Sequence, residues 1–239
     1  MIELAVHTYT KTPHTALAIF AHPDDAEIAC GATLAKWATQ ECHVILAVAT
    51  QGDKGGDGDD PNRVAEERTR ELLEAGRVLG VNDVIQLAYL DGELANTVEL
   101  RRRLVTLIRS FRPEVVLTGD PTAIFFGDLY YNHRDHRQLG WAVLDAVFPA
   151  ARQRAYFPEA GDPVDQIEVL LSATLEPNAG VATDGFTEKK IQAMQAHRAQ
   201  LARYEHALDQ AVFERARQAA RLAGLPGEAE LFRLVRGGA

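Results

Sequence analysis

Cysteine is scarce in this 239-residue chain, which contains only Cys30 and Cys42. Their spacing matches no CxxC motif of metal binding or redox chemistry, so we expect two reduced thiols. Long apolar runs are also missing, because no segment approaches the about 20 residues that a membrane-spanning helix needs. The first residues show no basic start followed by an apolar core, so we expect no secretory signal and a cytoplasmic protein.

Positive charge is in deficit, with 25 lysines and arginines against 34 aspartates and glutamates. The net charge of -9 argues against nucleic acid as the main partner, since phosphate binding needs a basic surface. The glycine-rich stretch GDKGGDGDD follows neither the GxGxxG nor the GxxxxGK[ST] pattern, and its aspartates would repel a phosphate group. We therefore expect neither a nucleic acid nor a nucleotide as ligand.

An alternation of short apolar runs and longer helical patterns fills the chain instead. Continuous apolar runs predict buried strands over residues 17–21, 43–49, 83–87, 114–118 and 167–173. Helical spacing of apolar residues predicts helices over 26–40, 64–79, 100–111, 137–148, 188–204 and 207–223. This rhythm predicts an α/β fold with a Rossmann-like, mostly parallel sheet that helices cover on both faces. Because no linker or repeat is visible, we expect a single domain over residues 1–239 with a helical C-terminal portion.

Reactive side chains follow two of the expected strands. HPDD, residues 22–25, follows the first strand, and NHRDH, residues 132–136, lies beyond the fourth. Ligands of open α/β sheets bind beyond the carboxyl ends of the strands, so both segments can face one site. Two histidines and one aspartate suit a zinc-type centre that leaves a position open for water. Such a metal lowers the pKa of bound water to about 7 and makes hydroxide available near neutral pH.

The remaining polar groups of these segments have natural roles beside such a centre. Asp24 diverges from its neighbour Asp25, so it is expected to face the water and take its proton. His133 is expected on the other side of the substrate, where it stabilises an oxyanion or protonates a leaving amine. Asp135 is expected to hold His133 in the charged form, because a nearby anion raises a histidine pKa. The alternative is structural: HPDD is a solvated turn and HRDH a solvated helix start.

Five stretches then occur in order between residues 17 and 148: AHPDDAEIACGATLAKW, RTRELLEAGRVLG, LDGEL, RPEVVLTGDP and YYNHRDHR. Together they resemble the PIG-L/LmbE-like family of zinc-dependent de-N-acetylases, and AHRAQ near residue 197 matches more loosely. The resemblance implies an enzyme that hydrolyses a non-peptide amide bond, in many members that of an N-acetylglucosamine conjugate. It also implies one zinc ion per chain, although a set of two histidines and one aspartate does not by itself distinguish zinc from iron or cobalt.

The resemblance assigns the chemistry residue by residue. The zinc ligands it implies are His22, Asp25 and His136. It makes Asp24 the general base, and His133 the general acid or oxyanion stabiliser with Asp135 as its orienting partner.

Further residues match the family less specifically. Tyr131 matches a tyrosine that polarises the scissile carbonyl in some members, and its alternative is an ordinary loop aromatic. Arg68 matches an arginine that lines the pocket, and Asp91 resembles a contact to a substrate hydroxyl. A surface charge and a plain turn residue are the respective alternatives. His197 and Gln200 are expected to be a helical surface pair.

One departure from the family concerns the segment after HPDD. Members often carry a Gly-x-Gly-Gly run where this chain has Ala29-Cys30-Gly31-Ala32. Alanine favours helix over glycine by up to about 1 kcal/mol per residue, and it adds methyl groups where glycine permits close approach. The pocket floor is therefore expected to differ from that of well-known members.

These observations lead to one main functional expectation. We expect a zinc-dependent hydrolase that removes the acetyl group from an N-acetylated amino sugar, so that its partner is a small amino-sugar conjugate. The alternatives are an amidase acting on a larger thiol or sugar conjugate and a non-catalytic metal-binding protein. The apolar stretch AIFF, residues 123–126, is expected to be a lid or an interface, which leaves a homo-oligomer open.

Overall fold

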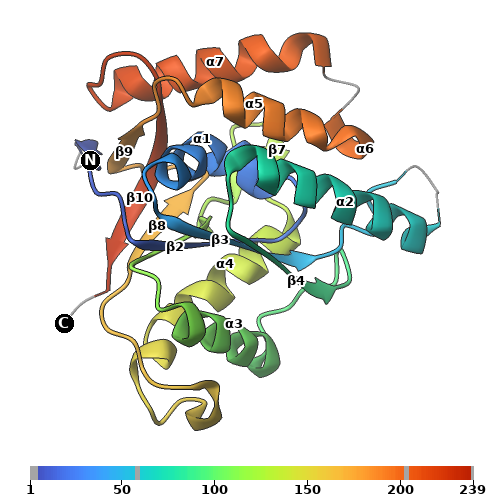
Figure 1. The fold of residues 1–239 in the computed structure, drawn as a ribbon, viewed down its shortest axis with the longest axis vertical. Coiled ribbons are helices and arrows are strands. Elements are labelled where there is room, and N and C mark those ends of the chain that lie inside the picture. The colour runs from blue at the N-terminus through green and yellow to red at the C-terminus, as the bar shows by residue number, and fades with distance from the viewer. Residues whose placement is uncertain (1–4, 57–59, 202–204, 238–239) are drawn as a thin grey trace.

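The computed structural model describes residues 5–56, 60–201 and 205–237 of the chain. One sheet of eight strands forms its centre, in the order β1-β9-β10-β8-β5-β2-β3-β4 (Figure 1). The strands are β1 (His7–Thr8), β2 (Thr15–Phe20), β3 (His43–Thr50), β4 (Asp83–Tyr89), β5 (Val115–Gly119), β8 (Glu168–Ser172), β9 (Ala179–Ala182) and β10 (Ala229–Arg236). Strands β8, β5, β2, β3 and β4 run parallel to one another, which confirms the expected α/β fold with a mostly parallel sheet.

Helices cover both faces of this sheet. They are α1 (Asp25–Thr39), α2 (Pro61–Leu79), α3 (Val98–Phe111), α4 (Arg134–Val147), α5 (Thr187–Ala196), α6 (Arg198–Leu201) and α7 (Glu205–Leu222). In Figure 1, α3 and α4 lie below the sheet, and α1, α2 and α5 lie above it. The helix expected over 188–204 breaks after Ala196 and resumes as α6, and residues 202–204 lie outside the described part of the chain.

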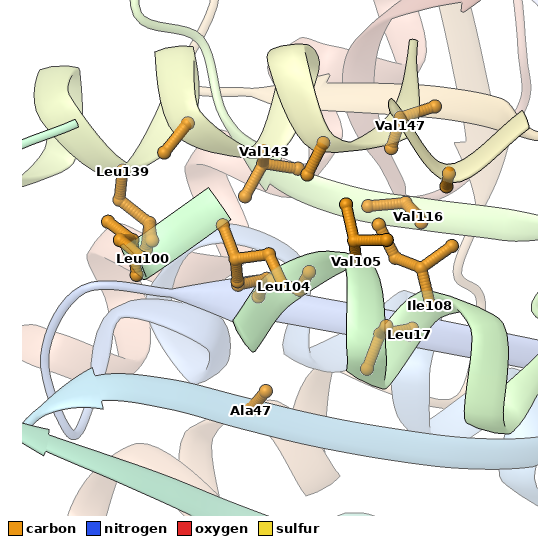
Figure 2. Close-up of a cluster of buried hydrophobic side chains, with 14 of the residues drawn as sticks. Leu17, Ala47, Leu100, Leu104, Val105, Ile108, Val116, Leu139, Val143 and Val147 are labelled. Carbon is orange, nitrogen blue, oxygen red and sulfur yellow. The ribbon is translucent and has the colours of Figure 1, made fainter. Parts of the chain in front are cut away.

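Strand β2 shows why the sheet needs two layers of helices. Its side chains alternate between the faces, yet Ala16 to Ile19 are all fully buried. Leu17 and Ile19 pack with residues of α3 and α4, as Figure 2 shows for Leu17 near Ile108. Ala16 and Ala18 pack on the other side with residues of α1, α2 and α5. A strand buried on both faces reads as a continuous apolar run, which is why the sequence revealed it.

The order of the parallel strands sets the position of the site. From β2, the chain passes through α1 to β3 on one side, whereas β5 lies on the other side of β2. The connections that leave β2 and β5 therefore diverge and open a crevice at the carboxyl ends of these strands. Residues 21–24 leave β2 there, and residues 120–133 leave β5, including the small hairpin of β6 (Phe125–Phe126) and β7 (Tyr130–Tyr131).

The C-terminal portion adds a strand that the sequence reading missed. β10 runs antiparallel between β8 and β9. Its Glu230 accepts hydrogen bonds from the backbone N–H groups of Ala32 and Thr33, and from Lys190 Nζ at 2.6 Å. Helix α1 is kinked at Cys30, whose φ is -147°, so the helix does not satisfy all of its own N–H groups at this point. Glu230 thus connects helix α1 to strand β10.

None of the described helices is both long and apolar enough to cross a membrane. Both cysteines are buried free thiols.

Candidate metal centre

The turn after β2 places three reactive side chains, those of His22, Asp24 and Asp25, within four consecutive residues. The amide of His22 donates to Asp25 Oδ2 at 2.8 Å, and the amide of Asp25 donates back to the carbonyl of His22 at 3.3 Å. Between them, Asp24 has a φ of 110°, in the left-handed region that a non-glycine residue seldom adopts. Such a residue costs about 1–3 kcal/mol and is found mainly at functional sites. The turn therefore sets the directions of Asp24 and Asp25 apart.

Three of the expected ligands converge. His22 Nδ1 lies 3.1 Å from His136 Nε2, and His136 Nε2 lies 3.1 Å from Asp25 Oδ1. The other oxygen of Asp25 lies 3.4 Å from His22 Nδ1. Around a tetrahedral zinc ion with bonds of about 2.0–2.1 Å, ligand atoms lie about 3.3 Å apart. The three donors therefore have the mutual spacing that such an ion requires.

The other ring nitrogen of each histidine is also held. His22 Nε2 lies 3.1 Å from Asp91 Oδ1 and 3.4 Å from Asp135 Oδ2. His136 Nδ1 lies 2.9 Å from Asn132 Oδ1. Metal-binding histidines typically donate their second N–H to a carboxylate or carbonyl oxygen, which fixes the tautomer and the ring orientation. Sequence reasoning missed Asn132, although its position four residues before His136 was a usable signal.

The charges around His22 favour a cation. Burial lowers the pKa of His22, but hydrogen bonds with Asp135, Asp25 and Asp91 outweigh burial and raise it to about 12. Burial raises the pKa of Asp25, but the neighbouring His136 and His22 hold it well below its usual range. Carboxylates thus outnumber cationic groups here, and the residues present fit a divalent metal ion.

Asp135 differs from its expected role. Its side chain is fully buried, and its carboxylate accepts hydrogen bonds from the amides of Gly92 at 2.6 Å and Leu94 at 3.2 Å as well as facing His22. Its contact with His133 is made by the backbone amide, not by the carboxylate. Asp135 therefore orients His22 and the loop that carries Asp91.

His133 lies at the N-terminus of α4 beside the ligands. Its Nδ1 accepts a hydrogen bond from the amide of Asp135 at 3.3 Å, which leaves Nε2 to carry the proton. Burial and the charge of His22 lower the pKa of His133 despite the opposing effect of Asp135. The expectation that Asp135 keeps this ring charged is thus not met. A neutral ring that donates from Nε2 suits the stabilisation of an oxyanion.

Asp24 is anchored from behind by Arg68. Nη2 of Arg68 lies 3.2 Å from Asp24 Oδ2 and donates to the carbonyl of Pro23 at 2.5 Å, while Nη1 donates to the carbonyl of Gly52 at 3.2 Å. Arg68 is only 3% exposed, so it is not the surface charge of the alternative reading. Burial, with the charge of Asp25, raises the pKa of Asp24 to about 7. Arg68 thus contacts the expected base, and its contact with a substrate remains untested.

The glycine-rich loop that follows β3 packs closely against Arg68. Gly52 has a φ of +62°, and a Cβ atom there would overlap the guanidinium of Arg68. Gln200 Nε2 donates to the carbonyl of Gly55 at 2.6 Å and holds the same loop. Gly52 and Gly55 therefore permit the close approach of Arg68 to this loop.

Tyr131 and Asp91 occupy different surroundings. Tyr131 is 70% exposed on the β6–β7 hairpin, whereas the adjacent Tyr130 lines the cavity beside the ligands. Asp91 faces His22, so its carboxylate is already engaged in the centre. Neither placement tests the substrate contacts expected of these residues.

The surface placement expected for His197 is wrong. His197 is fully buried, with Nε2 3.5 Å from Oε2 of the equally buried Glu27. The helical pattern continued through this position, but the chain leaves α5 there and turns the imidazole inward.

The chain is similar in sequence and fold to several known proteins. A family model described as PIG-L, GlcNAc-PI de-N-acetylase, matches residues 17–147. The chain is similar to the diacetylchitobiose deacetylase of Thermococcus kodakarensis, with 32% identity over 189 residues that cover 77% of this chain and 69% of that protein. It is also 31% identical over 182 residues to a 1D-myo-inositol 2-acetamido-2-deoxy-alpha-D-glucopyranoside deacetylase of Kineococcus radiotolerans. That match covers 62% of this chain and spans about half, 49%, of the relative.

A solved structure shares the fold over nearly the whole chain. It is the N,N'-diacetylchitobiose deacetylase of Pyrococcus horikoshii in complex with its inhibitor MPG, with a TM-score of 0.85 and 26% identity. The match covers 94% of this chain and 85% of that one.

Proposed function

The chain belongs to the PIG-L family of de-N-acetylases, and from that premise we propose that it hydrolyses the N-acetyl group of an amino sugar of the N-acetylglucosamine type. The products are acetate and a free amine. The named relatives are deacetylases of N-acetylglucosamine-containing compounds, which supports this substrate class.

The observation that carries the proposal is the convergence of His22 Nδ1, His136 Nε2 and the carboxylate of Asp25. These three residues would hold one divalent ion, for which we propose zinc, although the donor set also suits iron or cobalt. A metal bound there supplies Lewis acidity, which polarises the amide carbonyl and acidifies water.

Asp24 is the base in this proposal. It stands beside the ligand set without belonging to it, and Arg68 fixes its carboxylate. Asp24 takes a proton from the attacking water as the oxygen of that water bonds to the carbonyl carbon. The carbon–nitrogen bond then breaks, and the same proton passes from Asp24 to the leaving nitrogen.

His133 stabilises the negative charge that develops on the carbonyl oxygen. Its Nδ1 is occupied by the amide of Asp135, so its Nε2–H is the group that donates. We retain Tyr131 as a second donor to this oxygen, and Asp91 and Arg68 as residues near the sugar. For Tyr131 this role requires the exposed hairpin to turn its ring toward the ligands.

Measuring amine release from a panel of N-acetylated amino sugars, with and without a chelator, tests the proposal. We expect activity to disappear on chelation and to return with added zinc. Asp24→Asn should retain metal, measured by elemental analysis, and lose turnover, whereas Asp25→Asn should lose metal. Activity that is indifferent to both chelation and Asp24→Asn would overturn the assignment. Release of a larger acid in place of acetate would identify the amidase alternative.

A further inference from the structure

A cavity of about 750 Å³ adjoins the metal ligands. Asp25 and His136 line it, together with residues of α1, α5 and α7. Its volume lies in the range of small-molecule sites and exceeds what an acetyl group needs. A substrate group attached to the scissile amide can therefore extend into it.

The lining of this cavity is mainly apolar. Helix α7, which lies beside α5 in Figure 1, contributes one stripe at helical spacing. The stripe consists of Leu208, Ala211, Val212, Ala216, Ala219 and Leu222. From α1 come Ile28, Ala29 and Ala32, so the alanines that replace family glycines form part of the wall.

Several of these apolar side chains are only partly covered by the described part of the chain. Ile28 is 37% exposed, Tyr130 51% and Leu222 61%, although all three line the cavity. Ile28 lies on the first turns of a helix whose other large residues, Leu34 and Trp37, are buried in the core. Clustered apolar surface of this kind beside a reaction centre is typical of a ligand-binding cleft.

Besides the proposed ligands Asp25 and His136, the charged groups of the lining are one ion pair and Arg215 of α7. Lys190 and Glu230 neutralise each other at 2.6 Å, and Glu230 also accepts two backbone amides. The hydroxyl groups of Thr183 and Thr187 are buried there without a hydrogen-bond partner among the described residues.

We propose that the substrate of this chain carries an alkyl or aryl group that occupies the cavity between α1 and α7. This inference rests on the proposed hydrolysis of an amino-sugar amide at the metal centre, and it leaves the length of the acyl group open. The group is either the acyl part of the amide, longer than acetyl, or the aglycone of the amino sugar. Both sources present the same chemistry to the cavity.

Two series of compounds distinguish the sources in the metal-loaded enzyme. One series is glucosamine N-acylated with acids of two to eight carbons, and the other is N-acetylglucosamine with methyl to octyl aglycones. We expect kcat/KM for amine release to rise at least tenfold along one series, because burial of one methylene group contributes up to about fourfold. The series that rises identifies the source.

Matched variants and a binding measurement complete the test. Ala211→Trp should fill the cavity and reduce the ratio of kcat/KM for the longest to the shortest compound by tenfold. Gln210→Trp, exposed on another face of α7, should leave that ratio unchanged. Calorimetry of the products, alkyl glucosaminides and fatty acids, should show the same dependence on chain length without turnover.

The outcomes separate the two proposals. If N-acetylglucosamine is hydrolysed but neither kcat/KM in the two series nor the affinity of the two sets of products depends on chain length, the inference is overturned while the deacetylase function stands. If no compound releases an amine but product affinity rises with chain length and falls in Ala211→Trp, the cavity assignment stands and the proposed function fails.

Discussion

Replacing Gly52 with alanine tests whether the glycine loop positions the base through Arg68. The variant forces alanine into a left-handed conformation with a φ of +62°, which costs about 1–2 kcal/mol. Its Cβ would also lie 2.5 Å from Cζ of Arg68, so the guanidinium has to move. Each hydrogen bond that a charged group loses costs about 1.5–3 kcal/mol. We therefore expect the free energy of unfolding to fall by about 2.5–5 kcal/mol.

A second glycine provides the control for backbone strain. Gly224 has a φ of +64°, but a Cβ atom there would meet nothing within 4 Å. Gly224→Ala should therefore lose only about 1–2 kcal/mol. Urea unfolding measures both variants, and unchanged slopes make the midpoints comparable.

Catalysis gives an independent readout of the same contact. Displacement of Arg68 releases the carboxylate of Asp24, so kcat of Gly52→Ala should fall at least tenfold with unchanged metal content. Gly224→Ala should keep kcat. Equal losses of stability in the two variants, with kcat unaffected in both, would refute the reasoning.

Three further predictions concern groups outside the reaction centre. Arg109 is buried and donates to six backbone carbonyls between residues 150 and 161. Arg109→Lys should therefore lower the free energy of unfolding by about 3 kcal/mol. At denaturant concentrations below the unfolding transition, the variant should keep its activity. Hydrogen bonds from Tyr9 and Arg236 outweigh burial and lower the pKa of Glu168 in the folded protein. The ionised carboxylate therefore stabilises the fold above the pKa that it has in the unfolded chain, and this stabilisation is lost as the pH falls through the pKa of the folded state. Acid titration of Glu168→Gln should thus show a shallower decline in the free energy of unfolding than the parent protein does. His197→Phe leaves the buried carboxylate of Glu27 without the imidazole of His197, so the free energy of unfolding, measured in urea, should fall by about 3–5 kcal/mol. A second change, Glu27→Leu, should restore most of this loss. A single variant as stable as the parent protein would contradict the prediction.

The parallel part of the fold could be predicted from the sequence because burial on both faces leaves a simple signature. The run over 17–21 is apolar throughout, and the run over 43–49 is apolar after His43. They became β2 and β3, with ends shifted by at most two residues. β10 was missed because its burial is mixed along its length, and its partners β8 and β9 lie far from it in sequence. Local periodicity does not record such long-range pairing.

In the candidate site, too, one part could be predicted from the sequence and another could not. The ligands His22, Asp25 and His136 were expected at strand ends, and the structure brings their donor atoms together. The partners of these ligands could not be assigned from spacing. Asp135 faces His22 rather than the adjacent His133, because a residue in the first turn of a helix directs its side chain according to the helix and not to sequence proximity.

The position of β10 has a consequence for the order in which the protein is built. All three proposed ligands have left the ribosome once residue 136 has emerged, but β10 is the last of the described strands to be synthesised. At translation rates of about 5–20 residues per second, roughly 5 to 20 s pass between the synthesis of residue 136 and that of Glu230. Only then can Glu230 bind the backbone of the kinked helix α1. Until then, β9 cannot be joined to β8, and the sheet remains in two parts. The contact between Glu230 and helix α1 can therefore form only after all three proposed ligands have been synthesised.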